Sequence, residues 1–264
     1  MDTSSTSILR CVEGASNDTP LAALERLAIL GRYDTGQAVY RCNDSSEHWY
    51  RVVAGAARNT ALTVDGRRHI VDFVFPGDLF GFGGLRLRQF CVEAIVPRTL
   101  IARYPRESVE RLADSDPQTA RSIRQAAFES IARMQNRIVA LGRTRALEKV
   151  SVFLLEMSDR THTAPTGAMF LPMSRYDIAD YLGMAVETVS RTLSRLNGSR
   201  MIEFRGARQI SICDRAALEQ LASGVTGVPE GRPARRIEPS SMQSDLRLLA
   251  SRSHGGPPRS HATS

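Results

Sequence analysis

The sequence predicts an α+β protein with three parts: a β-barrel, one long helix, and a small C-terminal domain of helices and a hairpin. Three patterns predict this class. Short apolar runs separated by glycine fill the N-terminal half, apolar residues then recur at steps of three and four, and two short helical patterns around a glycine precede an alternating hairpin. A strand-rich domain therefore precedes a helical one.

The composition of the 264 residues is that of an ordinary globular protein, with 42% apolar and 24% charged residues. No stretch approaches the roughly 18 uninterrupted apolar residues of a membrane span, so we expect no membrane partner. Residues 1–20, expected to form a flexible leader, lack the basic flank and apolar block of a secretory signal. We therefore expect a cytoplasmic location and reduced cysteines.

Residues 21–115 are predicted to form the barrel. Apolar runs at 49–55, 61–66, 69–78, 91–96 and 100–104 alternate with turn residues at intervals of about ten residues. Repeated short strands with glycine-rich turns are typical of an antiparallel barrel or sandwich.

The long helix is predicted at 116–142. At 1.5 Å per residue it would span about 40 Å, which is more than a helix packed on one small domain usually reaches. The spacing favours a two-stranded coiled coil between two copies of the chain, although a core helix would also explain it. The predicted dimer seam consists of Ile123, Ala127, Ile131, Met134, Ile138 and Leu141.

A winged helix-turn-helix domain is predicted at 143–222. Ser174 followed by Asp177 is a capping box that begins a first helix, and Gly183 permits a tight turn. A second helix follows at 186–196, with Val189, Leu193 and Leu196 on its buried side. This order of a capped helix, a glycine turn and a second helix is typical of DNA-binding domains.

The exposed side of the second helix contains the candidate base-contacting residues Glu187, Ser190 and Arg191, which share one face at i, i+3 and i+4. In a major groove, arginine bonds guanine and glutamate accepts from cytosine. A simple surface ion pair between Glu187 and Arg191 is the alternative. Ser194 and Arg195 lie one turn later, where they would contact phosphates.

Residues 201–212 alternate around Gly206 like a β-hairpin, which we interpret as the wing. Arg205 and Arg208 at its tip are assigned to DNA backbone contacts, as are Ser174 and Arg175 at the start of the first helix.

The net charge of +7 is confined to the C-terminal part, because residues 111–264 hold 22 Lys and Arg against 15 Asp and Glu. This asymmetry favours a polyanionic partner for the second half, although a solvated basic surface is an equal alternative. Residues 223–264 are rich in serine, glycine and proline and contain no aromatic residue, so we expect a disordered basic tail.

With these motifs in view, the chain resembles the CRP/FNR family of bacterial transcription regulators over about residues 38–221, and within it the FixK-like and FNR-like branch. The resemblance lies in DIADYLG at 177–183, VETVSR at 186–191 and GRRHIVDFVFPGD at 66–78. It implies that the barrel is a jelly roll of the cyclic-nucleotide-binding type. It also implies a homodimer that contacts RNA polymerase as an activator in a low-oxygen, nitrogen-fixation or denitrification circuit.

The same resemblance makes Glu187, Ser190 and Arg191 the base-contacting residues. Val186 stands where the cyclic-AMP branch carries an extra arginine. The implied target is the palindrome TTGAT, four unspecified base pairs, ATCAA, and a symmetric target requires a symmetric dimer.

Relatives that bind cyclic nucleotides hold the ribose through a glutamate and the phosphate through an arginine followed by serine or threonine. Phe82 and the pair Arg88-Gln89 occupy these places here, so cyclic-AMP sensing is not expected, and Arg88 is interpreted as a surface charge. No cofactor is expected. A barrel that binds a nucleotide, or haem through His48 or His69, remains the alternative.

The cysteines, Cys11, Cys42, Cys91 and Cys213, lack the close spacing of an iron–sulfur motif, and no metal site is expected. Each thiol is expected to be buried or idle, and Cys213, just past the wing, is the best candidate for a redox switch. An enzyme built on a cupin barrel is disfavoured, because the histidines are not at metal-ligand spacing.

Overall fold

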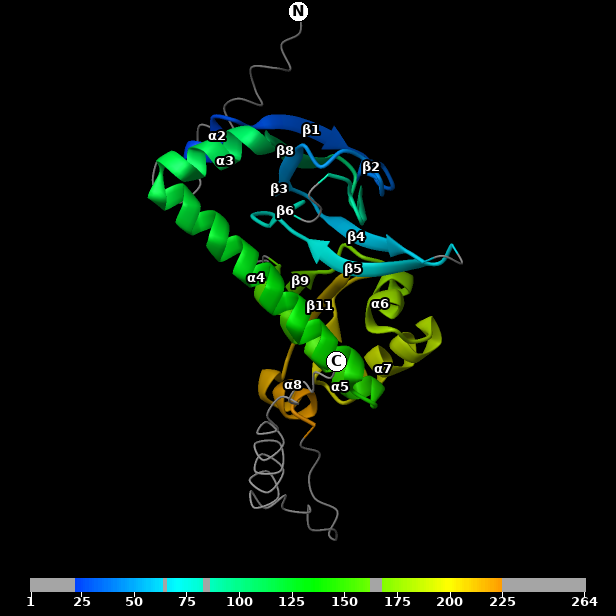
Figure 1. Ribbon diagram of the computed structural model, residues 1–264. Helices are drawn as coiled ribbons and strands as arrows, with labels where there is room; N and C mark the ends of the chain where they lie inside the picture. The colour runs from blue at the N-terminus through cyan, green and yellow to red at the C-terminus, as the bar shows by residue number, and fades with distance from the viewer. Residues whose placement is uncertain (1–21, 64–65, 83–85, 162–167, 225–264) are drawn as a thin grey trace, which may run out of the picture. The chain divides into compact units, whose positions relative to one another are not determined.

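The computed structural model describes residues 22–63, 66–82, 86–161 and 168–224. The predicted leader, 1–20, and all of the predicted tail beyond Gly224 lie outside the described residues. Figure 1 shows strands gathered in the N-terminal part, a long helix α4, and a small helical domain after it. The predicted mixed class is confirmed, while the predicted domain limits stay a prediction.

The barrel consists of two four-stranded antiparallel sheets, ordered β1-β8-β3-β6 and β2-β7-β4-β5. Strand β1 was not predicted, because its sequence ILGRY is interrupted by a glycine and an arginine. The strands are β1 (Ile29–Tyr33), β2 (Ala38–Tyr40), β3 (His48–Ala54), β4 (Ala57–Leu62), β5 (Arg68–Val74), β6 (Leu79–Phe80), β7 (Cys91–Ala94) and β8 (Thr99–Pro105).

The turn between β3 and β4 requires glycine. Gly55 has φ +88°, in the left-handed region, and a Cβ atom added there would lie 2.5 Å from the Thr99 hydroxyl oxygen. An L side chain would therefore be strained and would also collide with β8. This close approach brings the two sheets together at one end of the barrel.

Helices α2 (Ala22–Glu25) and α3 (Arg106–Ser115) flank the barrel, and α4 (Pro117–Gly142) follows. Helix α4 begins one residue after the predicted start and ends at the predicted residue. Asp116 separates α3 from α4 and caps α4, because its carboxylate accepts from the backbone N–H groups of Gln118 and Thr119. Pro117 at the first helical position has no N–H to satisfy, so the helix starts sharply here.

The C-terminal domain contains α5 (Ala146–Arg160), β9 (Ala168–Phe170), α6 (Arg175–Leu182), α7 (Val186–Gly198), β10 (Ile202–Phe204), β11 (Gln209–Ile212) and α8 (Arg215–Ala222). The predicted wing hairpin is present as β10 and β11. Its sheet has a third strand, β9, which pairs with β11 and was not predicted because it is only three residues long.

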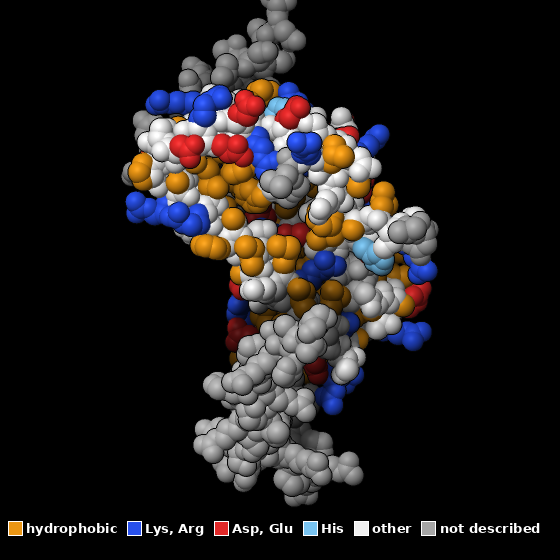
Figure 2. All heavy atoms as spheres, viewed as in Figure 1, with side chains coloured by type: hydrophobic (Ala, Val, Ile, Leu, Met, Phe, Trp, Pro, Cys, Tyr) orange, Lys and Arg blue, Asp and Glu red, His pale blue; other side chains and the backbone are white. Residues whose placement is uncertain are grey.

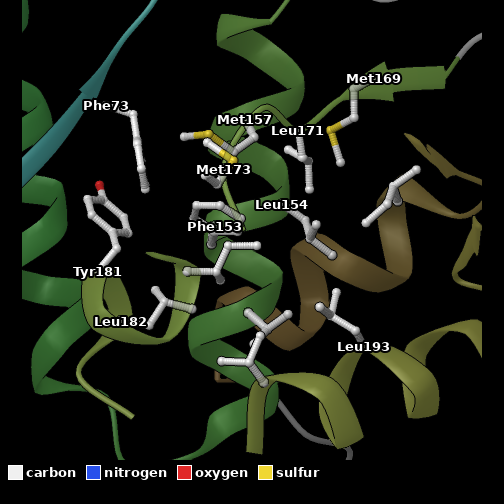
Figure 3. Packing of buried hydrophobic residues seen from close by; sticks show 14 of the residues in the cluster. Phe73, Phe153, Leu154, Met157, Met169, Leu171, Met173, Tyr181, Leu182 and Leu193 are labelled. Atoms are coloured by element: carbon white, nitrogen blue, oxygen red, sulfur yellow. The ribbon is translucent and has the colours of Figure 1, made fainter. Parts of the chain in front are cut away.

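The main apolar core belongs chiefly to the C-terminal domain. Phe153, Leu154 and Met157 of α5 are at most 1% exposed and pack with Leu193 of α7 (Figure 3). Barrel residues join the same cluster, since the Phe73 ring lies 5.2 Å from the Tyr181 ring of α6. The core is therefore continuous from the barrel strand β5 to the helix-turn-helix.

None of the helices in the described ranges is long and apolar enough to cross a membrane.

Candidate nucleic-acid interface

The α6–α7 unit is fixed locally by its cap and its turn. The Ser174 hydroxyl accepts from the Asp177 N–H, and the Asp177 carboxylate accepts from the Ser174 N–H at 2.9 Å. Gly183 ends α6 with φ +62°, a left-handed conformation that glycine adopts without strain. The predicted capping box and glycine turn are both confirmed.

Helix α7 has one buried and one exposed side. Val189, Leu193 and Leu196 are at most 1% exposed, as predicted. Glu187, Ser190 and Arg191 are all exposed, near the N-terminal end of the helix. The structure records no ion pair between Glu187 and Arg191 among the described residues, so the carboxylate and the guanidinium are available to an external partner.

Ser194 and Arg195 are also exposed, one turn further along α7. The helix thus presents a continuous polar surface, with the predicted base-contacting residues first and the predicted phosphate-contacting residues after them. Its N-cap, Ala185, makes no side-chain capping bond, so the first N–H groups of the helix are not satisfied by a cap side chain.

The wing tip is exposed from Arg205 to Gln209. Arg205 pairs with Glu203 through Nη2 at 2.7 Å, and both side chains are about half exposed. Arg208 donates from Nη1 to the Pro172 carbonyl oxygen at 3.1 Å, which ties the wing to the segment before α6. Both wing cations thus have an internal contact that a phosphate would supplement or replace.

The two predicted backbone contacts at the start of α6 have partners within the domain. The Ser174 hydroxyl donates to Asp177 Oδ2 at 2.7 Å, so a phosphate would have to replace this bond. Arg175 is half-buried with its guanidinium 5.4 Å from the centre of the Phe204 ring, and burial lowers the pKa of Arg175. Its Nη1 is buried without a hydrogen-bond partner.

Helix α4 exposes an apolar stripe, part of which is seen in Figure 2 along the path of α4 in Figure 1. Four predicted seam residues, Ile131, Met134, Ile138 and Leu141, are 39–69% exposed. Ile123 and Ala127 are half-buried, and Ile123 also packs against its own barrel cluster. Phe128 and Val139, each 62% exposed, widen the stripe and were not predicted.

The barrel encloses a pocket of about 310 Å³ against α4. Arg88 lines it and is only 2% exposed, so its interpretation as a surface charge was wrong. Its guanidinium donates to the carbonyl oxygens of Gly81 and His48 and lies 4.5 Å from the centre of the Tyr40 ring. Phe82, in the place of the ribose-binding glutamate, lines the same pocket.

The described histidines of the barrel do not converge. Burial lowers the pKa of His48, helped by Arg103, while His69 is half exposed and its Nδ1 lies 3.6 Å from Asp180 Oδ1. The described residues contain no group of three or more His, Cys, Asp or Glu that could hold a metal ion.

Cys42, Cys91 and Cys213 are free thiols, and Cys11 lies outside the described residues. Cys213 is exposed directly after β11, with its Sγ 3.9 Å from the Ser211 carbonyl oxygen. Cys42 donates its backbone N–H to Cys91 Sγ at 3.0 Å, a proximity that spacing alone did not predict.

We expect Arg205→Ala to weaken binding to all DNA sequences about equally and to reduce the salt slope, the change of log Kd with log salt, by about one. The reason is that Arg205 is assigned to a phosphate, which carries no sequence information. Titrations at several KCl concentrations measure the slope. Arg215→Ala is the control, since Arg215 of α8 is likewise an exposed arginine in an ion pair, with Asp159 of α5 and Glu219 of α8, but lies outside the wing. An unchanged slope for Arg205→Ala would contradict the assignment.

Comparison with known families supports the division into two functional parts. A family model described as "Crp-like helix-turn-helix domain" matches residues 148–221. A second, described as "Cyclic nucleotide-binding domain", matches residues 30–116. The first contains α6, α7 and the wing, and the second contains the barrel strands.

Individual relatives agree with these models. The chain is 35% identical to the nitrogen fixation regulation protein FixK of Rhizobium meliloti (strain 1021) over 195 residues, which cover 74% of this chain and 88% of the relative. It is 37% identical to FixK of Bradyrhizobium diazoefficiens over 210 residues, 76% of this chain and 86% of the relative. The solved structure of FixK2 from Bradyrhizobium japonicum is similar with a TM-score of 0.68 and 38% identity, covering 78% of this chain and 99% of that one.

Proposed function

Because the chain belongs to the CRP/FNR family of transcription regulators, in its FixK-like branch, we propose that it acts as a homodimer on a palindromic DNA site. It is a DNA-binding regulator of the FixK/FNR type. The site we propose is TTGAT, four unspecified base pairs, ATCAA. One observation carries the proposal: Glu187, Ser190 and Arg191 stand exposed together on α7, without an internal ion pair between the two charged groups in the described structure.

In the proposed complex, α7 lies in the major groove and its N-terminal residues contact base edges. Arg191 donates to guanine O6 and N7 of the half-site, and Glu187 accepts from a cytosine N4 amino group. The buried side of α7, which includes Leu193, packs into the core and so fixes the direction in which the helix presents these side chains. Sequence selection therefore depends on a helix that the core holds rigidly.

Phosphate contacts are proposed for Ser194 and Arg195 along α7 and for Arg205 and Arg208 on the wing, all of which are exposed. Ser174 and Arg175 remain candidates on the condition that their internal contacts rearrange. These contacts supply affinity without sequence information and make binding depend on salt.

The apolar stripe of α4 is the proposed dimer contact. Exposed side chains at the heptad steps Ile131, Met134, Ile138 and Leu141 suit a coiled-coil seam between two copies of α4. A pair of subunits related by a twofold axis then presents two α7 helices to the two halves of a palindrome.

We further propose that the regulator is an activator that contacts RNA polymerase in the cytoplasm and has no catalytic activity. The FixK relatives are named as regulators of nitrogen fixation, and other relatives, such as FnrA of Stutzerimonas stutzeri, are named as transcriptional activators. A low-oxygen, nitrogen-fixation or denitrification circuit is the corresponding proposal for this chain.

A barrel that senses a small ligand is the second candidate, and one observation favours it. Arg88 Nε and Asn59 Oδ1, one donor and one acceptor, are buried without hydrogen-bond partners, and both residues line the barrel pocket. A ligand that binds there would raise the melting temperature, and Asn59→Leu would abolish that rise. A nucleotide such as cyclic AMP is the first ligand to test in this pocket, whose lining includes neither His48 nor His69, the candidate haem ligands.

Selection from random duplex DNA with purified protein, with and without a reductant, tests the main proposal. The expected product is the TTGAT–ATCAA palindrome in the presence of reductant. Enrichment of an unrelated motif, or of none, would overturn the proposed specificity. Loss of binding without reductant that Cys213→Ser prevents would assign a redox role to the exposed Cys213 thiol.

A further inference from the structure

A cluster of charged side chains joins the barrel to α6. Arg58 of β4 pairs with Glu93 of β7 at 2.6 Å and with Asp177 of α6. Arg68 of β5 lies 3.2 Å from the same Glu93 and 3.4 Å from the same Asp177, and also 3.9 Å from Asp180. In Figure 1, β5 runs beside α6, and β4 is the next strand of the same sheet. Two barrel arginines thus hold the first helix of the DNA-binding unit.

The Asp177 carboxylate takes part in both the capping box of α6 and the ion pairs with the barrel. Its Oδ2 receives the Ser174 N–H and hydroxyl in the capping box, while its Oδ1 receives the guanidinium groups of Arg58 and Arg68. The Asp177 side chain is 6% exposed. A carboxylate this buried is stable in its charged form only if it is paired with opposite charges and its oxygens accept hydrogen bonds. Arg58 and Arg68 supply these charges to Asp177.

The orientation of α6 determines that of α7. Ile178 and Leu182 of α6 share one core cluster with Val189 and Leu193 of α7, and each of the four is at most 2% exposed. Closely packed side chains transmit displacement between helices because the interior has little free volume. Hence whatever holds α6 against the barrel also sets the direction of α7.

Resting on the proposed function, we infer that Arg58 and Arg68 are positioning residues that set the half-site spacing the dimer accepts. A palindrome is bound only if two recognition helices stand about one helical turn of DNA apart, roughly 34 Å. The long helix α4 fixes the barrels of the dimer, and the two arginines fix each α7 relative to its own barrel. The spacing preference therefore resides partly in the barrel, far from the bases.

The test measures the affinity of the full chain for duplexes whose TTGAT and ATCAA half-sites are separated by three, four, five or six base pairs, and for one half-site alone. For the double variant Arg58→Ala/Arg68→Ala we expect about tenfold weaker binding at four base pairs, with a correspondingly flatter preference among spacings. Affinity for the single half-site stays within about twofold, because α7 itself is unchanged.

The matched control is Arg32→Ala/Arg41→Ala, which removes the same charge from two exposed barrel positions. It is expected to keep the wild-type spacing profile. Arg58→Lys/Arg68→Lys keeps a positive charge beside Asp177 and should restore most of the preference, whereas the Arg32→Ala/Arg41→Ala control excludes net charge as the cause. A wild-type profile for a folded Arg58→Ala/Arg68→Ala variant overturns the inference.

If the double variant fails to fold, the single variant Arg68→Ala tests the inference instead. Its side chain is 38% exposed, and its removal leaves Asp177 paired with Arg58. We expect its preference for four base pairs to fall about twofold to threefold, and an unchanged profile would overturn the inference. A wild-type protein that does not prefer the palindrome over scrambled DNA would instead refute the proposed function, so the two failures are distinct.

Discussion

Arg191→Ala is expected to lose about 1–3 kcal/mol of binding free energy at the proposed palindrome and to relax selection at the G·C pair of each half-site. The reason is that alanine cannot make the two hydrogen bonds that a guanidinium makes to guanine O6 and N7. Arg191 is exposed on α7, so the variant should fold as the wild type does. Competition binding with matched and single-base-substituted duplexes measures the loss at each position.

Arg195→Ala is the matched control for Arg191→Ala, because Arg195 is exposed on the same helix one turn later and is assigned to phosphate. It should weaken matched and mismatched sites by the same factor. If Arg191→Ala discriminates between the two sites as the wild type does, Arg191 does not contact the base and the proposed docking of α7 is wrong.

Ile131→Glu/Ile138→Glu is expected to convert the dimer into monomers and to weaken binding to the palindrome by on the order of a hundredfold. The two isoleucines are 45% and 69% exposed on the α4 stripe, so glutamate at these positions costs the monomer little. In a dimer the same carboxylates would face their copies across an apolar seam. Sedimentation equilibrium gives the oligomeric state, and fluorescence anisotropy gives the affinity.

Leu87→Glu is the control for the seam, because Leu87 is also an exposed apolar residue, at 54%, but belongs to the barrel. It should stay dimeric and bind as the wild type does. A double seam variant that remains dimeric would show that the copies meet elsewhere, and the α4 stripe would then need another partner.

The sequence alone predicted the elements whose signals are local. The capping box of Ser174 and Asp177, the left-handed Gly183 and the apolar side of α7 all depend on residues within one or two helical turns, and each is confirmed. The short strands β1 and β9 lacked such a signal, because ILGRY and AMF are too short or too mixed to show a period of two.

Burial was harder to predict than secondary structure. Arg88 looks like any surface arginine in the sequence, yet the barrel closes around it and its guanidinium binds backbone carbonyls of Gly81 and His48. Ile123 fits the heptad spacing of the dimer seam, and it also packs against its own barrel. In each case the partner comes from a distant segment, which a periodic pattern does not encode.

The sequence by itself determined which side chains of α7 are exposed, since the order of a capped helix, a glycine turn and an amphipathic helix specifies which residues of α7 point outward. The tertiary structure alone decided what holds that helix in place. Arg58 and Asp177 are 119 positions apart, and only the packing of the barrel against α6, chiefly through β5, brings their charges together. Hydrophobic period is a property of neighbouring residues, whereas an ion pair across a junction exists only after both surfaces have folded and met.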